Sequence, residues 1–283
     1  MSKEQEWDLI LKPKSSWYQI DFKALWKYRD LVMLLVRRDF VSAYKQTILG
    51  PAWLFLQPII TSLMFAVIFG RLAKIGTEGT PSVLFYMAGV TLWTYFADCL
   101  TKTSTTFLTN AGVFGKVYFP RLVVPFSVII SNLVKLAIQM TLFFCIWFYY
   151  LVKGGSIHPQ WMLIWLLPVL VLMMAFLGFG FGILISSITT KYRDFIFLLG
   201  FGIQLMMYAS PVVYPLSIAS NKLKFWALLN PITSILEAFR YILFGNGYFS
   251  WAALGGSFGF MMILVLFSIF VFNAVEKNFM DTV

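Results

Sequence analysis

Residues 161–188 read WMLIWLLPVLVLMMAFLGFGFGILISSI, a run without a single charged side chain. A helix needs about 20 predominantly apolar residues to cross the roughly 30 Å hydrocarbon core of a bilayer. Five further stretches of the chain are long and apolar enough to do the same. The six predicted spans lie near residues 51–70, 83–108, 122–152, 161–188, 195–218 and 251–273.

These spans leave little material for a separate soluble domain. Of the 283 residues, 60% are hydrophobic and only 12% are charged. Backbone amides in hydrocarbon must be hydrogen-bonded within their own segment, which for runs of this length means helices. We therefore predict an all-α integral membrane protein with six transmembrane helices, whose function concerns something that crosses the membrane or resides in it.

The basic residues are concentrated ahead of the first span. The net charge is +10, and nine of the 22 Lys and Arg residues fall in the first 45 positions. Cytoplasmic segments next to transmembrane helices carry this excess of positive charge, which accounts for it without a nucleic-acid partner. An even number of spans then places both termini in the cytoplasm, with residues 1–20 as an irregular cytoplasmic tail.

A charged helix precedes the first span. Asp21 can cap it, and Phe22, Leu25 and Trp26 form an apolar patch among basic residues. The segment has too many charges to cross the bilayer. We expect residues 21–48, with their helical core at 22–40, to form an amphipathic helix in the cytoplasmic headgroup layer, in contact with membrane lipids. A soluble helix docked on a partner is the alternative, and the two are compatible.

Residues 219–250, between the fifth and sixth spans, contain apolar runs that are too short to cross a membrane. Prolines interrupt them, and irregular backbone at membrane depth is tolerated only where protein or water covers it. We expect short re-entrant helices here, on the outer side, that act as a gate. Close helix packing, rather than ligand binding, is expected at the GxxxG pairs Gly178–Gly182 and Gly255–Gly259.

Groups suited to catalysis are scarce. His158 is the single histidine, and the sequence contains no GxxxxGK[ST] phosphate loop. Cys99 and Cys145 lie inside predicted spans without metal-ligand spacing, so no metal site is expected. We predict that the chain is not an enzyme and that energy for uphill transport comes from a partner or an ion gradient. A membrane-embedded lipid-sugar transferase is the enzymatic alternative, for which no loop concentrates acids and histidine.

Charged residues inside predicted spans are costly and usually functional. Asp98 and Lys102 are four residues apart and are expected to pair on one helix face, and Glu237 and Arg240 are expected to pair on a candidate half-helix. Lys135 is expected to extend its ammonium group to an interface. The alternative is an ion-coupled carrier, in which these groups line a cavity near the middle of the membrane.

Aromatic residues are abundant, with 30 Phe, 13 Tyr and 10 Trp. Most are expected to face lipid or to form interfacial belts. Tyr and Trp near span ends also offer flat apolar faces with a polar rim, on which sugar rings can stack, and this chemistry suits a channel for a long glycan. The candidates are Trp53, Tyr86, Trp93, Tyr95, Tyr208 and Tyr214.

Five groups of short motifs occur in order along nearly the whole chain. They are WKYRDLVMLLVRRDF from Trp26 with YKQTxLGxxW from Tyr44 and Gln57-Pro58; NAG from Asn110 with KVYFPR from Lys116 and Pro125; YRD from Tyr192 with SPVVYP from Ser210; LNP from Leu229 with ExxR from Glu237 and Gly245; and EKxFxD from Glu276. In this order and spacing they resemble the permease subunit of the ABC-2 polysaccharide exporters, and most of all the O-antigen exporters.

The resemblance implies a bacterial inner-membrane homodimer that works with two copies of a separate ATPase subunit. ATP and Mg would bind that partner, and no cofactor would bind this chain. The cargo would be a polysaccharide on a polyprenyl diphosphate carrier, carried by an ABC-2 type transmembrane domain over residues 49–283. Exporters of teichoic acid and capsule are relatives, so the identity of the glycan stays open.

The same resemblance implies functional sites at the cytoplasmic face. An ATPase biases a permease only if its contacts differ between two states, and the amphipathic helix and the connection 109–121 are the rigid elements available. Arg also suits a diphosphate, because it forms bidentate hydrogen bonds; alternatively, Arg37 and Arg38 only supply cytoplasmic positive charge. The ATPase-coupling candidates are Arg37, Arg38, Asp39, Asn110, Lys116, Tyr118, Arg121, Arg193 and Asp194. The candidates for the entrance of the lipid diphosphate are Arg37, Arg38, Lys45 and Trp53.

On the outer side, the broken segment 211–245 would cover the exit, with Tyr208 and Tyr214 beside it. Prolines favour short helices that shift as rigid bodies. The residues expected to form the outer gate are Pro211, Pro215, Asn230, Pro231, Glu237 and Arg240.

Overall fold

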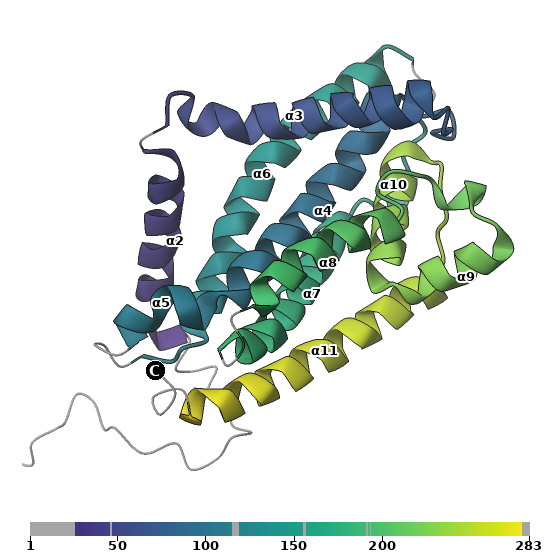
Figure 1. Cartoon of the computed structure of the whole chain (residues 1–283). Coiled ribbons are helices and arrows are strands. Elements are labelled where there is room, and N and C mark those ends of the chain that lie inside the picture. Colours follow the sequence, from purple (N-terminus) through teal and green to yellow (C-terminus); the bar gives the residue numbers. More distant parts are fainter. Residues whose placement is uncertain are drawn as a thin grey trace, which may run out of the picture.

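The computed structural model describes residues 26–45, 47–114, 119–154, 157–190, 192 and 194–278. Every regular element in these ranges is helical, and the tail 1–20 lies outside them. Figure 1 shows the long helices packed as a bundle, with α2 and α5 at one end and α9 and α10 at the other. The α-helices are α2 (Arg29–Tyr44), α3 (Trp53–Phe65), α4 (Ser82–Ser104), α5 (Thr106–Phe114), α6 (Val123–Val152), α7 (Leu166–Thr189), α8 (Phe195–Ala209), α9 (Asn221–Leu229), α10 (Pro231–Phe244) and α11 (Trp251–Asn278). Shorter turns of helix are η1 (Gly50–Ala52), η2 (Ala66–Leu72), η3 (Trp161–Leu163) and η4 (Leu216–Ile218).

Five continuous helical segments of the described chain are long and apolar enough to cross a membrane. They confirm the predicted first, second, third, fourth and sixth spans, with modest shifts of their ends. The first of them joins η1, α3 and η2 into one continuous segment. The five are Gly50–Leu72, Ser82–Ser104, Val123–Val152, Leu166–Thr189 and Trp251–Val275.

The predicted fifth span, 195–218, is shorter than expected. Helix α8 ends at Ala209 after 15 residues, about 22 Å at 1.5 Å per residue, and Ser210 has extended backbone. Pro211 and Pro215 lack the amide hydrogen that a continuing helix would donate, which explains the early end. The predicted second span also stops early, because a break at Thr105 separates α4 from α5.

Helix α2 is the described part of the predicted amphipathic helix, whose residues 21–25 lie outside the described ranges. It ends at Tyr44 rather than at residue 48. Figure 1 shows it running crosswise to α3 at the end of the bundle. Val32, Leu35 and Val36 are buried in an apolar cluster with residues of α5, α6, α7 and α11, whereas Met33 and Leu34 on the same helix are 66% and 61% exposed. One face therefore binds the protein, and the other is free for a lipid headgroup layer.

Helix α4 forms the centre of the bundle and is buried against α6 and α7. Two glycines of α7 allow the close approach: a Cβ atom at Gly178 would lie 2.8 Å from the Cys99 Cβ, and one at Gly182 would lie 2.6 Å from the Thr103 Cβ. This confirms the packing predicted for that GxxxG pair. A Cβ atom at Gly255 or Gly259 would meet no atom within 4 Å, so the second pair does not pack closely against another helix of the described chain.

Helices α9 and α10 form a sharply bent pair at an angle of 104°. Asn230 lies at the bend, where its Oδ1 accepts a hydrogen bond from the Ile232 amide and begins α10, with Pro231 as the first helical residue. Helix α10 is buried along nearly its whole length, whereas α9 buries only Ala227. The pair has the form expected of short re-entrant helices.

Candidate functional site

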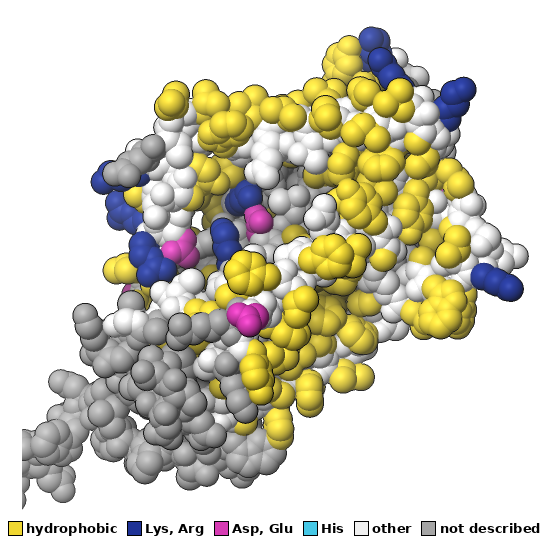
Figure 2. Space-filling view, viewed as in Figure 1, with side chains coloured by type: hydrophobic (Ala, Val, Ile, Leu, Met, Phe, Trp, Pro, Cys, Tyr) yellow, Lys and Arg dark blue, Asp and Glu magenta, His cyan; other side chains and the backbone are white. Residues whose placement is uncertain are grey.

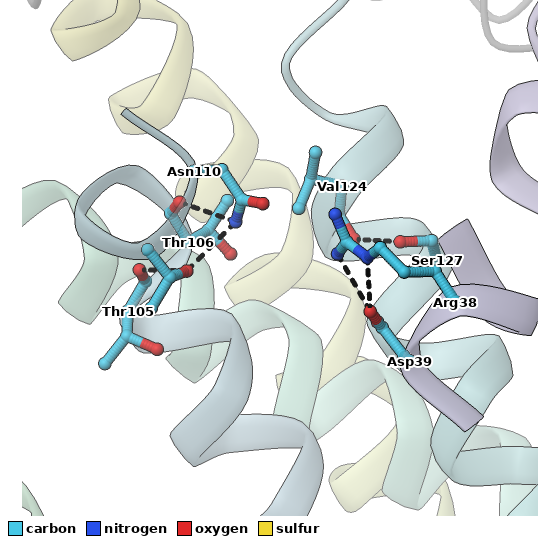
Figure 3. Close-up of polar contacts among 8 residues, drawn as sticks. Arg38, Asp39, Thr105, Thr106, Asn110, Val124 and Ser127 are labelled. Atoms are coloured by element: carbon cyan, nitrogen blue, oxygen red, sulfur yellow. Dashed lines mark hydrogen bonds and ion pairs between the residues drawn. The ribbon is translucent and has the colours of Figure 1, made fainter. Parts of the chain in front are cut away.

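Polar candidates of the predicted cytoplasmic face gather at the end of the bundle that carries α2 and α5. Figure 3 shows Arg38 and Asp39 of α2 beside the start of α6, and Asn110 of α5 turned back toward its own helix. Arg38 donates from Nε and Nη2 to Asp39 Oδ1 at 2.9 and 2.8 Å. Asn110 Nδ2 donates to the Thr106 carbonyl at 3.0 Å. Arg38 is thus held by its neighbour while its side chain stays 47% exposed.

The other coupling candidates do not gather in one place. The Arg121 guanidinium lies over the Phe114 ring, with 5.7 Å between its Cζ and the ring centroid, which places the end of α5 next to the start of α6. Arg37 and Asp194 are exposed. Lys116, Tyr118 and Arg193 lie outside the described residues.

Charged side chains also gather deeper in the molecule. Figure 2 shows basic and acidic groups together in a hollow between α2, α3 and α8, over α4 and α6. The charged residues of α4 are Asp98 and Lys102, and that of α6 is Lys135. Lys135 Nζ donates to Asp98 Oδ2 at 2.6 Å, and Lys102 Nζ donates to the Asn132 Oδ1 at 3.0 Å.

This arrangement corrects two predictions. Asp98 pairs with Lys135 of another helix rather than with Lys102 of its own, and Lys135 does not extend to an interface. The cause is the packing of α4 against α6, which brings residues 37 positions apart into contact. Tyr44, at the end of α2, adjoins the pair: burial raises the pKa of its hydroxyl, and Lys135 and Asp98 act on it in opposite directions.

A second ion pair lies at the end of the bundle that carries α9 and α10, and its separation of 3.4 Å confirms the predicted Glu237–Arg240 contact. We name it the outer pair, after the predicted outer gate to which both residues belong. Arg240 also donates to the carbonyls of Pro211 and Val212. Its guanidinium stacks on Phe85, with 3.7 Å from Cζ to the ring centroid. The side chains are 3% and 1% exposed for Arg240 and Glu237. The pair therefore joins α10, α4 and the turn after α8 in the interior.

Sequence reasoning missed several partners of this outer pair. Glu237 Oε2 accepts a hydrogen bond from the Tyr248 amide at 3.1 Å. Gly89 of α4 faces Arg240 so closely that a Cβ atom there would lie 2.6 Å from Nη2. A glycine in a predicted span was a usable signal of close approach, but nothing in the sequence shows what approaches it.

The candidate aromatics divide into two groups. Tyr86, Trp93 and Tyr95 of α4 are at most 4% exposed and pack in the protomer interior, so they face other helices rather than open space. Tyr208 and Tyr214 instead line a cavity of about 610 Å³. Trp226 of α9, which was not among the predicted aromatics, also lines this cavity. Their roles in a channel stay predictions.

Tyr214 and the entrance candidates occupy opposite ends of the molecule. Burial, reinforced by Glu237, raises the pKa of Tyr214, and its hydroxyl donates to the Ala209 carbonyl at 3.2 Å.

Trp53 is 47% exposed at the start of α3, and Lys45 is exposed just after α2. Pro215 precedes η4, which follows the turn that holds Arg240.

Comparison with known proteins gives the family. The sequence profile of the ABC-2 type transporters matches residues 30–244, most of the chain. The chain belongs to the ABC-2 type transporter family. Two proteins from Klebsiella pneumoniae, each named O-antigen export system permease protein RfbA, are 23% and 24% identical over 252 residues, 89% of this chain and 94% of theirs. A protein of the same name from Myxococcus xanthus is 26% identical over 227 residues, 78% of this chain and 83% of its own length.

The ABC-2 match begins within α2 and ends with α10. It therefore includes the hollow, the Asp98–Lys135 and Glu237–Arg240 pairs and the bent pair α9–α10, and it leaves α11 outside. An ABC-2 chain with several apolar spans is a multi-pass membrane protein with the role of a transport permease.

Proposed function

We propose that this ABC-2 permease is the channel-forming subunit of an ATP-driven exporter that moves a polyprenyl-diphosphate-linked polysaccharide, of the O-antigen kind, across the bacterial inner membrane. The observation that carries the proposal is the nearly full-length similarity to three O-antigen export permeases. A hollow with charged walls among apolar helices supports it, because such groups inside a membrane mark the path of a polar cargo.

The energy would come from a separate ATPase subunit. Two copies of that subunit, which would bind ATP and Mg, would associate with a homodimer of this chain. The exposed end of α2, with Arg37 and the Arg38–Asp39 pair, and helix α5 with Asn110 are the surfaces we assign to this contact. Because α2 belongs to one apolar cluster with residues of α5, α6, α7 and α11, movement of α2 by the ATPase would be transmitted to these helices.

The cargo would enter near α2 and leave near α9. With both termini in the cytoplasm, α2 lies in the inner headgroup layer, where Arg37, Arg38 and Lys45 can attract a diphosphate. Trp53, exposed at the start of α3, would contact the first sugars. The bent pair α9–α10 would form the outer gate, with Tyr208 and Tyr214 lining the cavity beneath it.

The first experiment is purification of the tagged chain from its native cell in mild detergent, with identification of co-purifying proteins by mass spectrometry. We expect a stoichiometric subunit that bears the GxxxxGK[ST] motif, and its complex should move lipid-linked glycan into proteoliposomes when ATP is supplied. Recovery of the chain alone, across several mild detergents, contradicts the proposal. Transport that an uncoupler stops while ATP stays high would instead favour an ion-coupled carrier.

The same reconstituted complex distinguishes the cargo. O-antigen, teichoic acid and capsule polymers on their lipid carriers can be offered separately. We expect ATP-dependent movement of an O-antigen type polymer; movement of teichoic acid or capsule alone would keep the export function and change the glycan.

A further inference from the structure

The charged side chains of the hollow lie deep in helices that are long enough to cross a membrane. Asp98 precedes the end of α4, at Ser104, by six residues, and Lys135 follows the start of α6, at Val123, by twelve. At 1.5 Å per residue these positions are about 9 and 18 Å inside their helices. Ionisable groups at such depth are rare because they are costly, and they face either a partner or a water-filled cavity.

These groups are only partly used by the protein itself. The side chains of Asp98 and Lys135 stay 29% and 19% exposed, and Lys102 is exposed. Among the described residues, Asp98 accepts through Oδ2, which leaves Oδ1 available, and each ammonium group makes one of the three hydrogen bonds that it can donate. These free donors and the free acceptor can bind a further polar group that enters the hollow.

The set of groups is mixed rather than cationic. Lys102 and Lys135 contribute +2 and Asp98 contributes −1, a net charge of +1, and the amide of Asn132 and the hydroxyl of Tyr44 add neutral polar groups. A dianionic diphosphate would have to approach the Asp98 carboxylate. A sugar hydroxyl both donates and accepts hydrogen bonds, so it can bind a carboxylate and an ammonium group at once.

Aromatic faces adjoin the same place. Tyr44 and Phe40 of α2 lie with ring centroids 5.1 Å apart, and Tyr44 is within electrostatic reach of both members of the ion pair. Polar groups that pair with hydroxyls, next to rings that cover the apolar faces of sugars, suit a carbohydrate better than an ion.

We propose that Asp98, Lys102 and Lys135 form a binding subsite for the hydroxyl groups of a glycan chain, inside the hollow between α2, α3 and α8. This inference rests on the proposed export function and adds the place where the polymer is held within the inner half of the permease. The Asp98–Lys135 pair stays formed without cargo and shares its free oxygen and hydrogens with passing sugars.

The first test replaces the pair by apolar groups in the intact complex with the ATPase. Asp98→Leu with Lys135→Leu keeps a contact between α4 and α6, since apolar replacement of an ion pair is often neutral for stability. We expect the reconstituted complex to export glycan at least tenfold more slowly, with an unchanged melting temperature. Thr141→Val is the matched control: this exposed α6 hydroxyl donates to its own helix, at the Ala137 carbonyl, and its loss should leave export unchanged.

The outcomes separate the two proposals. Wild-type protein that exports glycan, together with a double variant that exports equally well, overturns the subsite and leaves the export function intact. Wild-type complex that moves no glycan contradicts the export function itself.

A second test does not depend on the double variant being stable. In a Thr101→Cys, Cys145→Ala complex, which keeps all three proposed binding residues, a charged methanethiosulfonate reagent modifies the thiol at the exposed position next to Lys102, while Cys99 is buried. We expect glycan released from its lipid by mild acid to slow the modification at least threefold, and inorganic pyrophosphate to have no effect. Protection by pyrophosphate alone would assign the hollow to the diphosphate, and protection by neither would leave no subsite; either result overturns the inference.

Discussion

The outer pair, Glu237–Arg240, and the ion pair of the hollow, Asp98–Lys135, which we name the inner pair, have similar chemistry and opposite surroundings. Glu237 and Arg240, in α10, are almost completely buried and bind two backbone carbonyls and a backbone amide besides each other. Asp98 and Lys135 are closer together, at 2.6 Å, yet remain partly exposed on the wall of a hollow. The difference shows that distance does not reveal the role of an ion pair: the outer pair is part of the interior, whereas the inner pair lines a space.

The largest effect is expected from removing the outer cation. Arg240→Met leaves the Glu237 carboxylate buried without its counter-ion and takes donors from the Pro211 and Val212 carbonyls. Loss of one member of a buried pair costs about 3–5 kcal/mol. We expect a large fall in the melting temperature of the detergent-solubilised protein, measured by size-exclusion chromatography after heating. A variant with the melting temperature of the wild type would show that the outer pair does not stabilise the fold.

A smaller effect is expected from crowding the same pair. A Cβ atom at Gly89 would lie 2.6 Å from Arg240 Nη2 and 2.8 Å from the Val212 carbonyl oxygen. Overpacking of this kind costs about 1–3 kcal/mol, so Gly89→Ala should lower the melting temperature. Gly200→Ala in α8 is the control, because a Cβ atom there meets nothing within 4 Å. Equal melting of the two variants would mean that the contact yields without strain.

The single variant Lys135→Leu sharpens the comparison directly. It leaves Asp98 without its partner, as Arg240→Met does for Glu237, but the Asp98 side chain is 29% exposed and can be hydrated from the hollow. Because this hydration offsets part of the lost interaction, we expect a shift in melting temperature several times smaller than for Arg240→Met. If the two single variants lose equal stability, the hollow does not admit water and the contrast between the pairs disappears.

The smallest effect on stability is expected at the end of α2. The Arg38 and Asp39 side chains are 47% and 28% exposed, so Arg37→Ala with Arg38→Ala should change the free energy of unfolding by less than about 1 kcal/mol and leave the proposed homodimer intact. Export should nevertheless be abolished, because these groups are assigned to ATPase coupling and to the diphosphate. Arg29→Ala, on the same helix, is the matched control. Normal surface glycan in cells that carry the double variant contradicts the assignment.

The sequence predicts contacts within one helix far better than contacts between helices. The Glu237–Arg240 pair follows from a spacing of three residues, which every α-helix brings to one face. The spacing of Asp98 and Lys102 is equally favourable, but α6 places Lys135 beside Asp98 instead. Nothing in a single sequence specifies which helices are neighbours, so the position of the inner pair required the structure.

The membrane spans show the same limit. Uninterrupted apolar runs such as 161–188 predict helices directly, because hydrocarbon leaves no other way to satisfy the backbone. Residues 195–218 are equally apolar, yet α8 ends at Ala209, before Pro211. The burial of Tyr86 and Trp93 was equally unpredictable, because residues 83–93 contain no charged side chain that would mark an exposed face, and the central place of α4 comes from its neighbours.

Helix α9, unlike its neighbour α10, has little protein around it. Leu223, Phe225, Trp226 and Leu229 are each at least 60% exposed, and a single residue of the helix is buried. Its position is therefore set by acyl chains and the lipid–water boundary more than by protein contacts. A change in bilayer thickness or lateral pressure acts on this helix first. In the export function that we propose, the composition of the surrounding lipid then becomes a determinant of how readily the gate formed by α9 and α10 opens.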